Sequence, residues 1–135
     1  MPSISVTLNN VAGTEAAMGW AGSHTLVADR PSGTAGGLGL GFNGAELLAL
    51  AIGGCFCNDL RYVSHSRGIE IDEISVSVTL HLEGEPIIAT SAEMSVVCTT
   101  RDGSDAAPVV EQAKSSCMVS NSLARGIPVT ISMSA

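Results

Sequence analysis

Basic residues are scarce in this chain. Its 135 residues include six Lys and Arg against thirteen Asp and Glu, which gives a formal net charge of −7 at pH 7. A chain this acidic lacks the positive charge with which proteins bind nucleic acid or an anionic membrane surface. We therefore expect neither kind of partner.

Long hydrophobic runs are also missing. The longest apolar run, Leu47 to Phe56, is about half of the roughly 20 residues that a membrane-spanning helix needs. The first residues do not show the basic and apolar pattern of a secretory leader. These absences favour a cytoplasmic protein that does not contact the membrane.

Cysteines are few, and they do not suggest the disulfide framework of a small secreted protein. The chain has four of them, among 45% apolar residues. In a reducing compartment such thiols are free, and each is buried, metal-binding or reactive. The apolar content is enough to bury a core, and the chain shows no repeat and no dividing linker. We predict a single domain over residues 1–135.

The first third of the chain predicts strands followed by a loop. Residues Ser3–Leu8 and Met18–Arg30 alternate between apolar and polar side chains, as strands do, and a turn-prone stretch at residues 9–13 joins them. Residues Pro31–Gly41 are rich in Gly and Ser, which predicts a mobile loop.

A long helix is predicted next. Asn43 and Glu46 have the spacing of a capping box, and the pattern runs from residue 44 to about residue 66. The first half of this helix is apolar on every side, so we expect it to be buried in a core or a dimer interface. Gly53 and Gly54 each weaken a helix by about 1 kcal/mol relative to alanine, which implies that another group approaches closely there.

The second half of the chain predicts a hairpin, a helix and a final strand. Alternation indicates strands at Ile69–Leu82 and Ile87–Thr99, joined by a turn at Glu83–Pro86. A helix is expected from Asp105 to Ser120 and a last strand from Pro128 to Met133. This grouping predicts an α+β fold in which helices cover one face of antiparallel sheet.

Two cysteines stand in distinctive runs on the two predicted helices. One run is Gly53-Gly54-Cys55-Phe56, and the other is Cys117-Met118-Val119-Ser120-Asn121-Ser122-Leu123. Thiols far apart in sequence, each among small residues on a helix, can act as an attacking and a resolving pair in peroxide reduction. The alternative is that both are buried as small apolar side chains, as free cysteines commonly are.

Both runs resemble those of a known family. Residues Glu46 to Cys55, ELLALAIGGC, resemble the central-helix run of the OsmC/Ohr family (osmotically inducible protein C and organic hydroperoxide resistance protein), and Cys117 to Leu123 is similar to that family's C-P-x-S-N-x-L segment. The resemblance implies an OsmC-like fold, with antiparallel sheets packed on a long central helix and a second cysteine-bearing helix. It also implies an intertwined homodimer with active sites at the subunit interface.

The activity that the resemblance implies is thiol-dependent reduction of organic hydroperoxides without a cofactor. Cys55 would attack the peroxide and become a sulfenic acid, Cys117 would form a disulfide with it, and an external dithiol would reduce that disulfide. A free thiol is only a few per cent ionised at pH 7, since its pKa is near 8.5, so a nearby cation is expected.

In the family's peroxidases, an arginine from the N-terminal strand region activates the thiol and is held by a glutamate just before the cysteine helix. In this sequence neither residue is in its usual place. The pattern N-P-E becomes Asn43-Gly44-Ala45 here, so Glu46 is either a helix cap or the residue that holds an arginine across the subunit interface. Arg30 is the only arginine before Pro31 and is our candidate for the activating cation. Asp59, one helical turn after Cys55, would raise the pKa of that thiol.

The remaining charged and thiol side chains have simpler interpretations. Arg61 and Arg125 are expected to be solvated, and Cys57 and Cys98 are expected to pack in the interior.

Two other functions stay open. One is a metal-binding module, although the spacing of its candidate ligands does not match that of structural zinc sites, which use C-x(2–4)-C pairs. Those candidates are Cys55, Cys57, Cys117, His24, His65 and His81. The other is an OsmC-fold protein with weak or no peroxidase activity that binds a small apolar ligand at the dimer interface.

Overall fold

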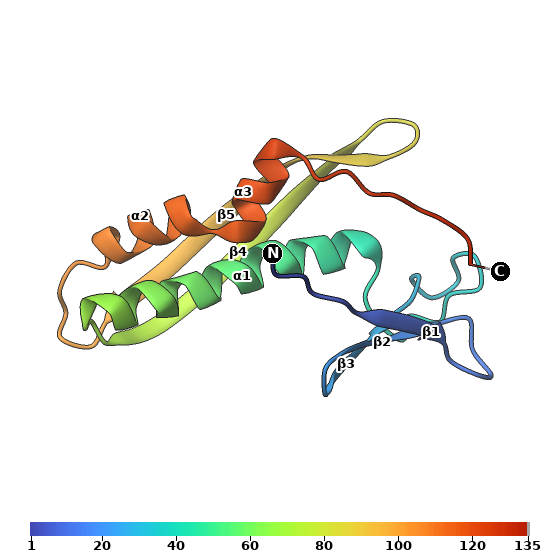
Figure 1. Cartoon of the computed structure of the whole chain (residues 1–135), viewed down its shortest axis with the longest axis horizontal. Coiled ribbons are helices and arrows are strands. Elements are labelled where there is room, and N and C mark those ends of the chain that lie inside the picture. The colour runs from blue at the N-terminus through green and yellow to red at the C-terminus, as the bar shows by residue number, and fades with distance from the viewer. Residues whose placement is uncertain (135) are drawn as a thin grey trace. The chain divides into compact units, whose positions relative to one another are not determined.

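The computed structural model describes residues 1–134, which form strands and helices in two compact units (Figure 1). The first unit comprises Met1–Leu48 and the second begins at Ala49. The elements in chain order are β1 (Thr7–Asn10), β2 (Ala17–Ala21), β3 (His24–Ala28), α1 (Gly44–Arg67), β4 (Ile71–Glu83), β5 (Ile88–Thr100), α2 (Ala107–Ser116) and α3 (Met118–Arg125). The fold is α+β, as predicted. No helix among the described residues is both long enough and apolar enough to cross a membrane.

The first unit contains an antiparallel sheet in the order β1-β2-β3. The single strand predicted over residues 18–30 is wrong, because the chain reverses at Gly22, whose φ of 61° a residue with a side chain rarely adopts. The turn expected at residues 9–13 starts later. Asn9 and Asn10 still belong to β1 and pair with Met18 and Ala17 of β2.

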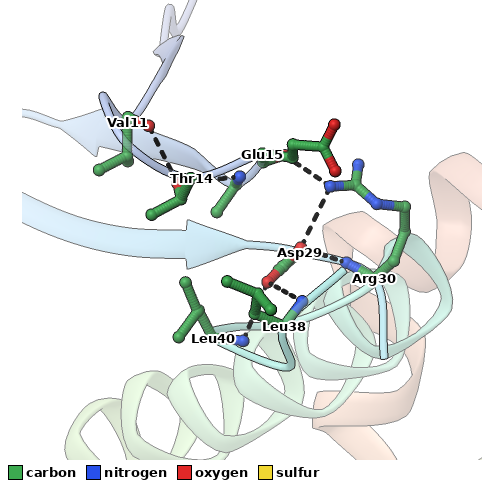
Figure 2. Close-up of polar contacts among 8 residues, drawn as sticks. Val11, Thr14, Glu15, Asp29, Arg30, Leu38 and Leu40 are labelled. Atoms are coloured by element: carbon green, nitrogen blue, oxygen red, sulfur yellow. Dashed lines mark hydrogen bonds and ion pairs between the residues drawn. The ribbon is translucent and has the colours of Figure 1, made fainter. Parts of the chain in front are cut away.

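The loop predicted at Pro31–Gly41 contains turns but no helix or strand. It is organised around Asp29, whose carboxylate accepts backbone N–H groups of Leu38 at 3.1 Å and of Leu40 at 3.0 Å (Figure 2). Phe42 then closes the loop, because its N–H and C=O bond to the backbone of Val27 and Asp29. This buried carboxylate therefore fixes the path of the chain into α1.

The capping box at the start of α1 is confirmed. The N–H of Glu46 donates to Oδ1 of Asn43 at 2.9 Å, and the N–H of Asn43 donates to Oε1 of Glu46 at 2.9 Å. The helix ends at Arg67, where Gly68 adopts a φ of 67°. The bonds between Asn43 and Glu46 are the reciprocal bonds that satisfy the free amides at a helix start.

The second unit contains the core. Strands β4 and β5 form an antiparallel hairpin, and α1 and α2 lie side by side along it (Figure 1). The buried core side chains come from α1, β4 and α2: Phe56, Leu60, Val63, Ile71, Val109 and Ala113. A register shift between Ile71 and Glu73 inserts one residue, so Ile71 and Ile74 both reach this core although they are an odd number of positions apart.

The close approach expected at the glycine pair is confirmed for Gly53. A Cβ there would lie 3.0 Å from Cγ2 of Val78 and 3.6 Å from Cγ1 of Val76. A Cβ at Gly54 would meet nothing within 4 Å. Gly53 therefore lets α1 approach strand β4 closely, while Gly54 lies on an open face of the helix.

Two predictions for the end of the chain are wrong. The helix expected over residues 105–120 is broken at Cys117, whose φ of −64° and ψ of 110° are extended, so it divides α2 from α3. The strand expected from Pro128 to Met133 does not form, and residues 126–134 are irregular. Val129 and Ile131 are 80% and 91% exposed. Among the described residues of a single chain, no strand pairs with this segment.

Candidate functional site

The two predicted redox cysteines reach one site by different local structures. Cys55 lies within α1 and is half-buried. Cys117 is 2% exposed and stands at the junction where α2 ends and α3 begins. Because the backbone of Cys117 is extended, α2 and α3 are two separate helices and do not form one continuous helix through this residue. Both residues belong to the second unit.

The sulfurs of Cys55 and Cys117 lie close together, with the carboxylate of Asp59 beside them. One ligand atom from each of these residues lies within 4.8 Å of the others. The thiol of Cys55 donates to Oδ2 of Asp59 at 3.6 Å. Asp59 is four residues after Cys55, so a single helical turn brings its carboxylate to the sulfur. Tertiary packing alone supplies the second sulfur.

The surroundings of Cys55 oppose ionisation of its thiol. Burial raises the pKa of Cys55 above its ordinary value, and the neighbouring Cys117 and the negative charge of Asp59 raise it further. One group acts the other way: the backbone N–H of Val119, at the start of α3, lowers this pKa. Amides at a helix start favour an anion. In the second unit, therefore, the group that favours the Cys55 thiolate is a backbone amide.

An open hollow adjoins Cys117. It has a volume of about 450 Å³ and is lined by the apolar side chains of Phe56, Met94, Val96 and Val110. Its lining also includes Glu111 and Lys114, which form an ion pair at 3.4 Å. A hollow with apolar walls and a sulfur in its lining can hold the hydrocarbon part of a small molecule next to that sulfur.

Arg30 and Glu46, the two other predicted site residues, lie in the first unit. The guanidinium of Arg30 donates to Oδ1 of Asp29 at 3.2 Å and to the backbone carbonyl of Glu15 (Figure 2). The carboxylate of Glu46 bonds to Asn43 at the helix start. The cap predicted for Glu46 is present, and its other predicted role, holding an arginine across the subunit interface, stays a prediction. Within the described residues, Asp29 and not Glu46 is the carboxylate that holds Arg30.

Asp29 is the residue that the sequence interpretation missed. Its side chain is 1% exposed, and its pKa is held below the ordinary value of 3.8, chiefly by the N–H of Leu40 and then by those of Leu38 and Arg30. An acidic residue at the end of a strand, directly before Arg-Pro and a Gly-rich loop, was the available signal.

The other cysteines and arginines lie outside this cluster. Cys98 packs against the core of the second unit, as predicted, and burial raises its pKa while the charge of Arg61 lowers it. Cys57 is half-buried on α1. Arg61 and Arg125 are exposed, in agreement with the expectation that they are solvated.

The fold and the site define a class of protein: an α+β domain with two cysteines brought together from a long central helix and a helix junction. The chain belongs to the OsmC-like protein family, whose model matches residues 36–132. No curated protein matches it.

Solved structures of this family resemble the chain. The OsmC-like protein from Mycoplasma pneumoniae is 14% identical with a TM-score of 0.74, and the match covers 91% of this chain and 88% of that one. The organic hydroperoxide resistance protein OhrB of Bacillus subtilis is 25% identical with a TM-score of 0.57 and 88% of both chains covered. An organic hydroperoxide resistance protein OsmC from Legionella pneumophila, described as a predicted redox protein, is 19% identical with a TM-score of 0.61 and 90% and 88% coverage. The fold predicted from the two cysteine runs is thereby confirmed.

Proposed function

We propose that this protein is a thiol-dependent peroxidase that reduces organic hydroperoxides, with Cys55 as the attacking thiol and Cys117 as the resolving thiol. The observation that carries the proposal is the convergence of their sulfurs to within 4.8 Å from distant parts of the sequence. A disulfide needs a sulfur separation of about 2 Å, so a modest movement at the Cys117 junction would complete the bond. The hydroperoxide resistance proteins among the similar structures support the same reaction class.

The proposed cycle balances with one hydroperoxide and one external dithiol. The Cys55 thiolate attacks the outer peroxide oxygen, the O–O bond breaks, and the leaving alkoxide takes a proton to become an alcohol. The sulfur, oxidised by two electrons, is now a sulfenic acid. The Cys117 thiol condenses with it, which forms the disulfide and releases water. The external dithiol then reduces the disulfide to two thiols.

Thiol counting combined with peptide mapping tests the cycle. Reduced protein treated with one equivalent of cumene hydroperoxide is expected to lose two of its four thiols and to yield a peptide pair linked between Cys55 and Cys117. Cys55→Ser should abolish the rapid loss, and Cys117→Ser should leave a sulfenic acid that dimedone traps. Cys57→Ser and Cys98→Ser are the matched controls and should behave as wild type. Slow oxidation spread over all four cysteines would refute the assignment.

The working form in this proposal is a homodimer. The apolar side chains of Val129, Ile131 and Met133 alternate along a segment that is exposed and unpaired in the described single chain. Alternation of this kind is typical of a strand with one buried face. A second copy would supply the missing partner. Ile131→Asp should shift the mass measured by light scattering toward the monomer, whereas Thr130→Asp, on the other face, should not. A wild-type monomer would overturn this part of the proposal.

A second candidate function is binding of a small apolar ligand. It is favoured by the raised pKa of Cys55 and by an apolar hollow of about 260 Å³ in the first unit, whose lining includes Leu8, Trp20 and Leu26. Trp20 is the only tryptophan of the chain, so its fluorescence reports on this hollow. Saturable energy transfer from Trp20 to anilinonaphthalene sulfonate, lost in Leu8→Asp, together with slow unselective thiol oxidation, would favour ligand binding over catalysis.

A further inference from the structure

The cluster of Cys55, Asp59 and Cys117 has the composition of a site for a thiophilic metal ion. Two thiols and one carboxylate present three ligand atoms within 4.8 Å of one another. Cysteine thiolate is a ligand that zinc and other thiophilic ions favour, and zinc sites also use carboxylate oxygen. Of the described residues, neither Cys57 nor any histidine takes part in this cluster.

The spacing of the three atoms suits tetrahedral coordination. With Zn–S bonds of about 2.3 Å and Zn–O bonds of about 2.0–2.2 Å, ligand atoms lie about 3.5–3.8 Å apart. The sulfur of Cys55 and Oδ2 of Asp59 are already 3.6 Å apart. The sulfur of Cys117 needs to move inward by no more than about 1 Å to complete three legs of a tetrahedron.

The backbone around the cluster would hold two of these ligands firmly. Cys55 and Asp59 are one turn apart on α1, so the helix fixes their separation, and the buried Leu60 and Phe56 anchor the same part of the helix in the core. Cys117 is buried between α2 and α3. The three protein ligands leave a fourth position for water or another ligand, as in zinc sites with an open coordination position.

We propose that the reduced protein binds one Zn²⁺ or Cd²⁺ ion per chain through the sulfurs of Cys55 and Cys117 and the carboxylate of Asp59. Both thiols release their protons to the buffer when the metal binds. Mg²⁺ should not compete, because it requires octahedral oxygen ligands. Metal binding and disulfide formation exclude one another, since oxidation of the two sulfurs by a hydroperoxide removes both thiolates.

Titration of the reduced full-length protein with Cd²⁺ tests the site, because each cadmium–thiolate bond adds an ultraviolet charge-transfer band. We expect saturation at one ion per chain with the intensity of two thiolates, and an unchanged spectrum with Mg²⁺. Cys55→Ser and Cys117→Ser should each halve the band and weaken binding. Asp59→Asn should keep the full band and weaken binding at least about tenfold, which corresponds to about 1.4 kcal/mol. Cys57→Ser and Cys98→Ser should match wild type.

Either of two results would overturn the site: no saturable band in the wild type, or affinity unchanged by both Cys55→Ser and Asp59→Asn. Because Asp59 is partly exposed, its variant keeps the test valid if a cysteine variant does not fold, which circular dichroism would show. The readout needs no peroxide. Failure of the peroxidase cycle would leave the cadmium band intact, and failure of metal binding would leave the disulfide in the hydroperoxide experiment.

Discussion

Oxidation of Cys55 and Cys117 to a disulfide should stabilise the protein strongly. The bond would close a loop of about 60 residues, and the loss of chain entropy in the unfolded state then corresponds to about 4 kcal/mol. The sulfurs start within 4.8 Å of one another, so closure requires some movement at the Cys117 junction, and this strain lowers the gain. We therefore expect the oxidised protein to be more stable than the reduced protein by about 2–4 kcal/mol.

Urea unfolding of the two redox forms measures this difference. With an m-value of about 2 kcal/mol/M, the midpoint should rise by about 1–2 M on treatment with hydroperoxide. Protein concentration must be equal in both samples, because dimerisation also stabilises the folded state. Cys117→Ser provides the control and should show no gain. If oxidation leaves the midpoint unchanged, or if the gain persists in Cys117→Ser, the two sulfurs do not bridge and the resolving role of Cys117 is refuted.

Three further predictions concern the thiol, the glycine pair and the buried carboxylate. Because burial holds the pKa of Cys55 above its ordinary value, its alkylation by iodoacetamide should still accelerate at pH 9. Asp59→Asn should move this pH profile to lower pH by removing a negative charge, and an unmoved profile would show that the carboxylate does not act on the sulfur. Gly54→Ala should raise the free energy of unfolding by about 1 kcal/mol, since its Cβ enters open space. Gly53→Ala should raise it by less, because its Cβ would lie 3.0 Å from Val78. Equal increases in urea unfolding would contradict the packing described. Asp29→Asn should destabilise the protein at pH 7. A carboxyl whose pKa is depressed in the folded state contributes its full stability only above its unfolded pKa, so the difference from wild type should vanish as pH falls through the folded pKa of Asp29, which lies below 3.8. A difference in stability that does not depend on pH would contradict this.

Elements with strong local signals were predicted well. The capping box at Asn43 and Glu46 needs only a few neighbouring residues, and it is present as expected. The β4–β5 hairpin follows from alternation on either side of a turn, which is also local information. The reversal at Gly22 had a signal as well, because Gly-Ser between two alternating runs is typical of a hairpin turn, but the pattern was interpreted as one strand.

Features that depend on distant contacts were not predictable in the same way. Helical spacing continues through Cys117, yet the chain is extended there, and this buried cysteine divides α2 from α3. The segment from Pro128 to Met133 has the alternation of a strand, but a strand forms only where another strand accepts its hydrogen bonds.

The same distinction between local and distant contacts applies to the candidate site. The sequence by itself determined that Asp59 lies beside Cys55, because four residues of α-helix are one turn and one turn has a fixed length. The resemblance of the run from Cys117 to Leu123 to the family's second cysteine segment predicted a resolving role for Cys117, which stays a prediction. Only the tertiary structure decided that the sulfur of Cys117 meets the other two groups, since that proximity depends on α1 and α2 packing on one face of the β4–β5 hairpin around a shared core.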